Sequence, residues 1–208
     1  MKVIMDILFI VDLFGIFAFA VTGVIGGMRK DLDIIGALFC GVAASLGGGL
    51  VRDTVLGLPV QSFFNEWYLW TAVIATVLTY FFYKEVWKKY HLFLHADAVG
   101  LAVFTIVGAT KALDNDLGFL GILFLGAITA VGGGMIRDIL IQKMPVVLQK
   151  ELYVVPSLLG SSLFTLLQNY LSLELSVVVA GLFVFCFRVL ALRYSLTLPT
   201  KGVQDSLF

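Results

Sequence analysis

The stretch GGGLVRD at residues 47–53 returns as GGGMIRD at residues 132–138, and each copy lies inside a long apolar segment. Three consecutive glycines are an unusual choice in such a segment, because each glycine costs a helix about 1 kcal/mol relative to alanine. An arginine and an aspartate deep in an apolar segment normally face a protein interior or a water-filled path. The doubled motif therefore indicates a site of function and decides how the rest of the chain is interpreted.

The composition places the chain among integral membrane proteins. Of its 208 residues, 60% are hydrophobic and 13% are charged, and the mean hydropathy is +1.02. Such values are typical of chains that cross a bilayer several times. The formal net charge is zero, so no bulk electrostatic field favours nucleic acid as a partner.

Apolar windows long enough to cross a membrane as helices predict an all-α integral membrane fold with seven transmembrane helices. The expected spans are 4–26, 34–56, 67–87, 95–113, 117–141, 152–169 and 173–194. The first span could also be read as a signal peptide, because Ala18-Phe19-Ala20 resembles a cleavage site. Asp6 and Asp12 interrupt its apolar run, which favours a membrane helix.

The chain contains an internal repeat with an offset of 85 residues, which aligns Asp12 with Asp97 and Asp31 with Asp116 as well as the two motifs. Each copy is expected to hold three helices. Because three is odd, the second copy must enter the membrane from the opposite side, which predicts an inverted-topology repeat. The expected units are residues 1–90, the inverted residues 91–170, and residues 171–208 with the seventh helix and tail.

The connections between spans carry basic residues mainly on one side, and basic connections face the cytoplasm. One side has only Lys2 and Lys111. The other side has Arg29, Lys30, Lys84, Lys88, Lys89, Lys143, Lys150, Arg193 and Lys201. The N-terminus is therefore expected outside and the C-terminus in the cytoplasm. The juxtamembrane basic cluster could also contact anionic membrane lipids.

The glycine triplets permit two interpretations. Glycines at four-residue spacing let membrane helices pack closely, and Gly41, Ser45 and Gly49 form such a stripe. Packing alone does not require three glycines in a row, however. A helix broken at the triplet would expose carbonyls and amides near the midplane, where they can hold ions or zwitterions. The charged pair after each triplet favours the broken helix.

The two arginines are either salt-bridge partners that lock helices together or members of a transport path. Asp12 and Arg52 are expected at similar depths, and the repeat then pairs Asp97 with Arg137. A helix turns about 100° per residue. Asp53 and Asp138 are therefore expected to point away from the neighbouring arginines and to remain available to other partners.

No enzymatic or metal site is expected. His91 and His95 have a spacing that could bind a metal on a helix, but no third ligand accompanies them. The glycines follow no strand and lack the lysine of a phosphate-binding loop. The sequence therefore predicts a protein that is not an enzyme and has no cofactor.

With two three-helix units, each carrying GGG-x-x-R-D in its second helix, and a seventh helix, the chain resembles bacterial members of the trimeric intracellular cation channel family. That family's repeat unit is also described as a glycine-transporter domain. The resemblance covers residues 5 to 194. It implies a homotrimer in the bacterial inner membrane, with one potassium-permeable pore per subunit lined by glycine-broken second and fifth helices. Animal members carry a Lys-Glu-Val motif; Lys84-Glu85-Val86 has these letters at a different place.

Carried over by position, the resemblance assigns the pore to the residues of the two motifs. These are Gly47, Gly48, Gly49, Arg52, Asp53, Gly132, Gly133, Gly134, Arg137 and Asp138, with Asp12 and Asp97 as charge partners. The residues themselves leave two functions open. One is a channel for monovalent cations such as potassium, and the other is a secondary carrier for a small zwitterion such as glycine.

Overall fold

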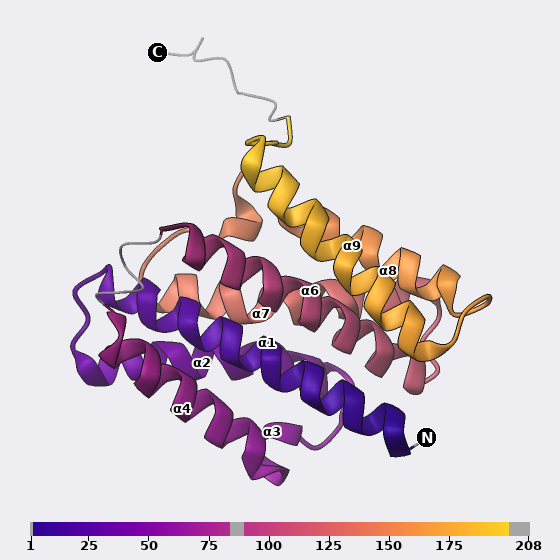
Figure 1. Cartoon of the computed structure of the whole chain (residues 1–208), viewed down its shortest axis with the longest axis horizontal. Coiled ribbons are helices and arrows are strands. Elements are labelled where there is room, and N and C mark those ends of the chain that lie inside the picture. The colour runs from indigo at the N-terminus through magenta and orange to yellow at the C-terminus, as the bar shows by residue number, and fades with distance from the viewer. Residues whose placement is uncertain (1, 84–89, 200–208) are drawn as a thin grey trace.

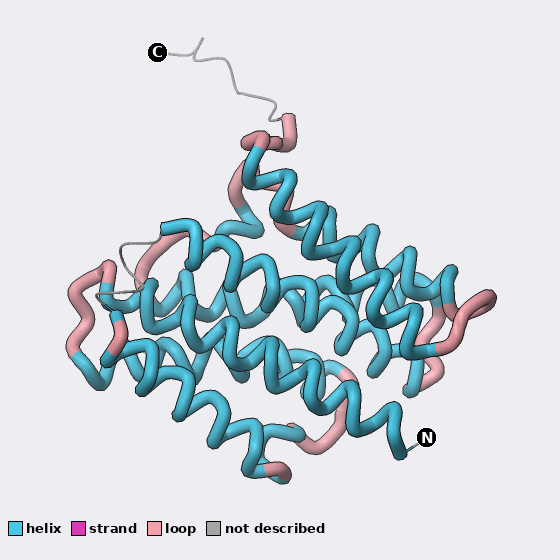
Figure 2. The backbone as a smooth tube through the Cα atoms, viewed as in Figure 1, coloured by secondary structure: helices cyan, strands magenta, loops and turns pink. Residues whose placement is uncertain are grey.

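The computed structural model describes residues 2–83 and 90–199, with side chains placed for residues 7–83 and 92–199. The Lys84-Glu85-Val86 motif, the side chain of His91, and Lys88, Lys89 and Lys201 of the orientation argument lie outside these residues. Within the described ranges the chain is all-α and contains no strand (Figure 2). One isolated β-bridge joins Glu151 to Thr197.

The helices follow the order expected from the apolar spans. They are α1 (Lys2–Met28), α2 (Ile34–Val55), α3 (Gln61–Phe64), α4 (Glu66–Phe81), α6 (Tyr90–Asp114), α7 (Phe119–Leu140), the 3-10 helix η1 (Val146–Leu148), α8 (Val154–Leu167) and α9 (Leu173–Arg193). The short α3 and η1 were not expected. They lie at matched places, in the connections that follow α2 and α7.

The connections of the two halves have matching backbone conformations. Asp31 after α1 and Asp116 after α6 both have positive φ, 55° and 56°. Gly57 after α2 and Gln142 after α7 also match, with φ of 66° and 52°. Left-handed residues of this kind end helices and turn the chain. Residues that the 85-residue repeat aligns therefore also have the same backbone conformation in these turns.

Figure 1 shows α1 and α6 side by side across the middle of the molecule, with α2 and α7 behind them. The helix α4 packs on α1 and α2 along one edge. On the other side, α8 and α9 pack on each other and on α6. The helices α2 and α7, which carry the two motifs, pack directly against one another at the centre.

Five of the seven expected spans have helices long and apolar enough to cross a bilayer: α1, α2, α6, α7 and α9. The remaining two are shorter than expected, with 16 residues in α4 and 14 in α8. At 1.5 Å per residue, α4 covers roughly 24 Å. Large apolar side chains lie exposed on the outside of the bundle, including Phe14, Phe39, Phe124 and Leu182. A surface of this kind fits lipid rather than water, so the chain is an integral membrane protein.

The prediction that the glycine triplets break their helices is wrong. Both α2 and α7 run as α-helix through their triplets. The glycines instead allow the two helices to touch. A Cβ atom at Gly48 would overlap the carbonyl oxygen of Thr129 on α7, and one at Gly133 would overlap that of Ala44 on α2. Close packing of small residues therefore outweighs the low helix propensity of glycine.

The third glycine of each triplet has a different environment. A Cβ at Gly49 would meet only the Nη2 atom of Arg52, at 3.7 Å. A Cβ at Gly134 would meet Nη2 of Arg137, also at 3.7 Å, and the Tyr153 hydroxyl at 2.9 Å. These glycines leave space beside the arginine side chains. The consecutive glycines therefore lie on two faces of each helix. On one face they allow the close contact of α2 with α7, and on the other they leave room for the arginine side chain.

Candidate functional site: two buried charge clusters

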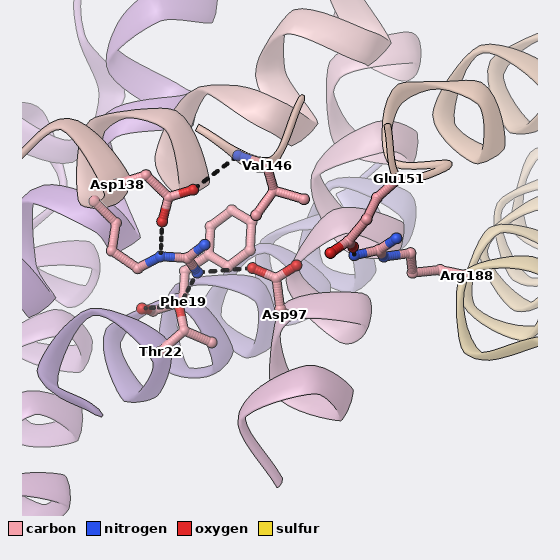
Figure 3. A network of polar contacts seen from close by, with 8 residues as sticks. Phe19, Thr22, Asp97, Asp138, Val146, Glu151 and Arg188 are labelled. Atoms are coloured by element: carbon pink, nitrogen blue, oxygen red, sulfur yellow. Dashed lines mark hydrogen bonds and ion pairs between the residues drawn. The ribbon is translucent and has the colours of Figure 1, made fainter. Parts of the chain in front are cut away.

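Arg137 forms the centre of a compact charge cluster, which Figure 3 shows with Asp97, Thr22 and Asp138 converging on one guanidinium group. Its Nη1 atom donates to Asp97 Oδ1 on α6, at 2.7 Å, and to Thr22 Oγ1 on α1, at 2.9 Å. Its Nε atom donates to Asp138 Oδ1 at 2.9 Å. The guanidinium carbon lies 5.0 Å from the centre of the Phe93 ring, within the range of a cation–π contact. We call this group the Arg137 cluster.

Arg52 forms a matched but looser cluster with Asp12 and Asp53. Its Nε atom donates to Asp53 Oδ1 at 2.7 Å. Its Nη1 atom lies 3.9 Å from Asp12 Oδ2 on α1, which is too far for a hydrogen bond. Nη1 is buried without a hydrogen-bond partner among the described residues, as is Ser62 Oγ. We call this group the Arg52 cluster.

The prediction that Asp53 and Asp138 point away from their arginines is wrong. Each carboxylate accepts from the Nε atom of the arginine that precedes it. Its second oxygen accepts a backbone N–H from the following connection, Gln61 at 2.9 Å for Asp53 and Val146 at 3.0 Å for Asp138. The long arginine side chain bends back to its neighbour, so the angular separation of the two Cα–Cβ bonds does not keep them apart. The aspartates thereby tie η1 and α3 to the clusters.

Two cavities lie beside the Arg52 cluster. Asp12, Arg52, Ser62 and Tyr68 line a cavity of about 10 Å³, enough for one water molecule. Asp12 and Tyr68 also line a larger cavity of about 560 Å³ that includes Lys111 and lies beside the first one. Tyr153 takes the place of Tyr68 beside the Arg137 cluster: the two tyrosines align in the repeat, and both are buried.

Arg188 on α9 is a third buried arginine, which the sequence analysis missed. Its Nη2 atom donates to Glu151 Oε2 at 2.8 Å and its Nη1 atom to the carbonyl of Leu152 at 3.0 Å. Its guanidinium carbon lies 4.8 Å from the centre of the Tyr153 ring. Figure 3 shows the Arg188–Glu151 pair next to the Arg137 cluster. The argument applied to the motif arginines, an ionisable residue within an apolar span, could have identified it.

The residues predicted from the motifs therefore gather in one region. Gly47, Gly48, Gly132 and Gly133 form the α2–α7 contact, and the arginines and aspartates lie in two clusters, one for each half of the repeat. Arg52 and Arg137 are 2% and 1% exposed. Buried arginines with carboxylate partners of this kind can bind a small ion or a polar ligand, and they can hold helices in place.

Comparison with known proteins identifies the family. The family model described as "Glycine transporter" matches twice, at residues 9–84 and 94–169. The UPF0126 membrane protein of Deinococcus radiodurans is 32% identical over 197 residues, which cover 93% of this chain and 92% of the relative. The inner membrane protein YadS of Escherichia coli K12 is 32% identical over 199 residues, 94% of this chain and 96% of the relative.

Solved structures of channels share the fold. A structure that describes conductance through TRIC cation channels superposes with a TM-score of 0.86 at 32% identity and covers 95% of this chain and 98% of its own. The TRIC trimeric intracellular cation channel orthologue from Rhodobacter sphaeroides also gives 0.86, at 34% identity, over 91% of this chain and 99% of its own. These structural relatives are channels rather than enzymes. The chain therefore belongs to the prokaryotic trimeric intracellular cation (TRIC) channel family.

Proposed function

We propose that the chain is a channel for monovalent cations, permeable to potassium, with one pore in each subunit. The path passes along the contact of α2 and α7 and through the Arg52 and Arg137 clusters. The observation that carries this proposal is the pair of matched, buried charge clusters on helices that meet at the centre of the molecule. The structural relatives, which are described as cation channels, support the same function.

An arginine in a cation path needs to be neutralised, and each cluster supplies more than enough negative charge. Arg137 lies between two carboxylates, those of Asp97 and Asp138. Arg52 likewise has two, those of Asp12 and Asp53. With all these groups ionised, each cluster carries one net negative charge. Buried carboxylates that exceed their cations attract a mobile cation, as rings of acidic residues do in cation channels.

We also propose that the two halves form an inverted repeat, with residues 1–90 and 91–170 as its units and residues 171–208 as an addition. Equivalent residues contact each other across the centre, as expected for a pseudo-two-fold axis. Phe19 and Phe104 are 85 positions apart, and their ring centres lie 5.2 Å from each other. If this axis lies in the membrane plane, one charge cluster lies in the outer half of the path and the other in the cytoplasmic half.

The assembly that we propose is a homotrimer in the bacterial inner membrane, with the N-terminus outside and the C-terminus in the cytoplasm. The trimer is supported by the description of the Rhodobacter relative, and the membrane by the E. coli relative. The orientation follows from the excess of basic residues in the connections on one side. Lipids contact the exposed apolar side chains of the bundle.

A bilayer recording separates the channel from the carrier. Purified protein in a planar bilayer with potassium chloride is expected to give discrete current steps whose reversal potential follows the potassium gradient. The matched control is protein-free detergent added to the same bilayer. Saturable uptake of glycine into vesicles, without current steps, would contradict the channel and favour the zwitterion carrier.

A further inference from the structure

A wide cavity lies beside the Arg52 cluster, where the C-terminal end of α6 meets the connection between α2 and α4. Its volume is about 560 Å³, within the range of small-molecule sites, about 300–1,000 Å³. We call it the vestibule. Its lining includes the buried Asp12 and Thr110 and the exposed Asp114 and Trp67. In the proposed orientation the vestibule faces outside, so solutes of the surrounding medium reach it directly.

The vestibule holds an acidic and a basic side chain that do not pair with each other. The ammonium group of Lys111 and the carboxylate of Asp114 interact electrostatically, yet neither residue takes part in any ion pair among the described residues. An ammonium group has three donors. That of Lys111 makes one hydrogen bond within the described part of the chain, to Gln61 Oε1 at 3.3 Å, which is a long one. Both charges therefore remain available to a ligand.

Thr110 adds an unpartnered polar group to the same lining. The residue is 1% exposed, and its Oγ1 atom has no hydrogen-bond partner among the described residues. A hydroxyl group buried without a hydrogen bond destabilises the folded chain. Such a group calls for an occupant that supplies the missing partner.

These groups together match an α-amino acid in its zwitterionic form. Lys111 can bind the carboxylate of the ligand and Asp114 its ammonium group, each through charge-assisted hydrogen bonds. The apolar part of the lining, which includes Phe9, Trp67 and Val107, can take the side chain. A simple cation is repelled by Lys111 and a simple anion by Asp114, so neither uses the whole lining.

The repeat does not duplicate this arrangement. The residues that align with Lys111 and Asp114 in the first half are Gly26 and Arg29. A Cβ atom at Gly26 would lie 3.5 Å from Cδ of Arg137, so this position borders the Arg137 cluster as Lys111 borders the Arg52 cluster. A glycine and a second base replace the base and the acid there. The acid–base pair therefore belongs to the vestibule and not to the repeated unit.

We propose that the vestibule is a binding site for a zwitterionic α-amino acid with an apolar side chain. Lys111 binds the carboxylate, Asp114 binds the ammonium group, and the Thr110 hydroxyl donates to the carboxylate. The cavity is wider than glycine requires, and its apolar lining favours a larger side chain. This inference goes beyond the proposed channel, because binding does not depend on the passage of cations.

The test measures the unfolding temperature of the purified full-length protein with L-leucine as the probe. A ligand that binds only the folded state raises this temperature as its concentration rises. L-leucine is expected to act in a saturable manner. Leucinamide lacks the carboxylate and isocaproate lacks the ammonium group, so each should bind at least about tenfold more weakly. Glycine should also bind more weakly than leucine, because it leaves the apolar lining exposed.

Three variants assign the contacts. Lys111→Gln should weaken leucine at least about tenfold and remove its advantage over leucinamide, and Asp114→Asn should do the same for its advantage over isocaproate. Thr110→Val should weaken leucine about threefold or more, while its unfolding temperature without leucine should not fall, because an unpartnered hydroxyl group is removed. The matched control is Lys143→Gln, an exposed lysine in the connection after α7, which should keep the parent's affinity.

Equal responses to leucine, leucinamide and isocaproate would overturn the inference, as would the absence of a saturable response to leucine. Neither result depends on a variant that folds. Full affinity for leucine in both Lys111→Gln and Asp114→Asn would also overturn it. The channel is tested separately, since a parent that binds leucine but passes no current supports the site and contradicts the proposed function.

Discussion

At the scale of single residues, the two motif arginines differ in how completely they are paired. Arg137 donates to Asp97, Asp138 and Thr22, whereas Arg52 Nη1 has no hydrogen-bond partner among the described residues and borders a cavity. Charge-assisted hydrogen bonds in a dry site are strong. The same chemical motif therefore gives a tightly paired cluster in one half and a looser one beside a cavity in the other.

Arg137→Ala is expected to destabilise the protein more than Arg52→Ala. The first change leaves Asp97 and Asp138 buried without their cation, at a cost on the order of 3–5 kcal/mol. The second leaves Asp12 and Asp53 without their cation, but Asp12 lies beside a cavity that water can fill, so the loss should be smaller. Thermal unfolding of both variants in the same detergent measures the difference.

The control for this comparison is Asp12→Asn/Arg52→Ala, which removes both charges of the loose pair. It should unfold closer to the parent than Arg52→Ala alone, because one carboxylate of the cluster, that of Asp53, is then left without its cation instead of two. Equal unfolding temperatures for the two arginine variants would contradict the assigned difference between the clusters.

The partners of the arginines across helices follow from the repeat, but the local partners do not. Asp12 and Asp97 align at the 85-residue offset, and each lies on the helix that faces its arginine. Whether Arg52 bends back to Asp53 depends on side-chain torsions that spacing does not specify. Arg188 reaches the site only because α9 folds over the second half, which no periodicity encodes.

At the scale of helices, the contact of α2 with α7 explains why the triplets tolerate a low helix propensity. The cost of about 1 kcal/mol per glycine is offset by dispersion contacts between closely approaching backbones. The sequence correctly marks the triplets as unusual. It does not distinguish a broken helix from two intact helices in close contact, because both require residues without a side chain.

Gly48→Ala and Gly49→Ala should have opposite effects on stability. The added methyl group of Gly48→Ala overlaps the carbonyl oxygen of Thr129, and overpacking of this kind costs about 1–3 kcal/mol. The methyl group of Gly49→Ala meets only Arg52 Nη2 at 3.7 Å, and the alanine favours the helix by up to about 1 kcal/mol. Denaturation midpoints of the two variants check this. A triplet that acts as a hinge rather than a contact would make both variants similar.

At the scale of the whole molecule, the proposed inverted repeat would assign one face to each cluster. The turns after α1 and α6, and those after α2 and α7, have matching conformations. Seven helices were expected and their order is as expected, yet α4 and α8 are shorter than the spans that the apolar windows predicted for them. Apolar windows locate helices, but the position of helix ends depends on capping and on the neighbouring connection.

Single cysteines placed at Lys2 and at Lys201, in a Cys186→Ser background, test the orientation in intact cells. An impermeant thiol reagent added outside should label the cysteine at position 2 and leave the one at position 201 unlabelled until the cells are opened, because the basic connections face the cytoplasm. Labelling of position 201 from outside would reverse the topology and exchange the faces assigned to the two clusters.

The central claim is that monovalent cations pass through the Arg52 and Arg137 clusters, and single-channel recording of the two arginine variants tests it most directly. Arg52→Ala and Arg137→Ala, each first shown to retain the parent's mass in nanodiscs, should change the unitary conductance or the open probability for potassium. Asp12→Asn should also change one of these quantities, since it removes one of the two carboxylates that neutralise Arg52. If both arginine variants assemble and conduct like the parent, the path does not run through the clusters and the account is contradicted.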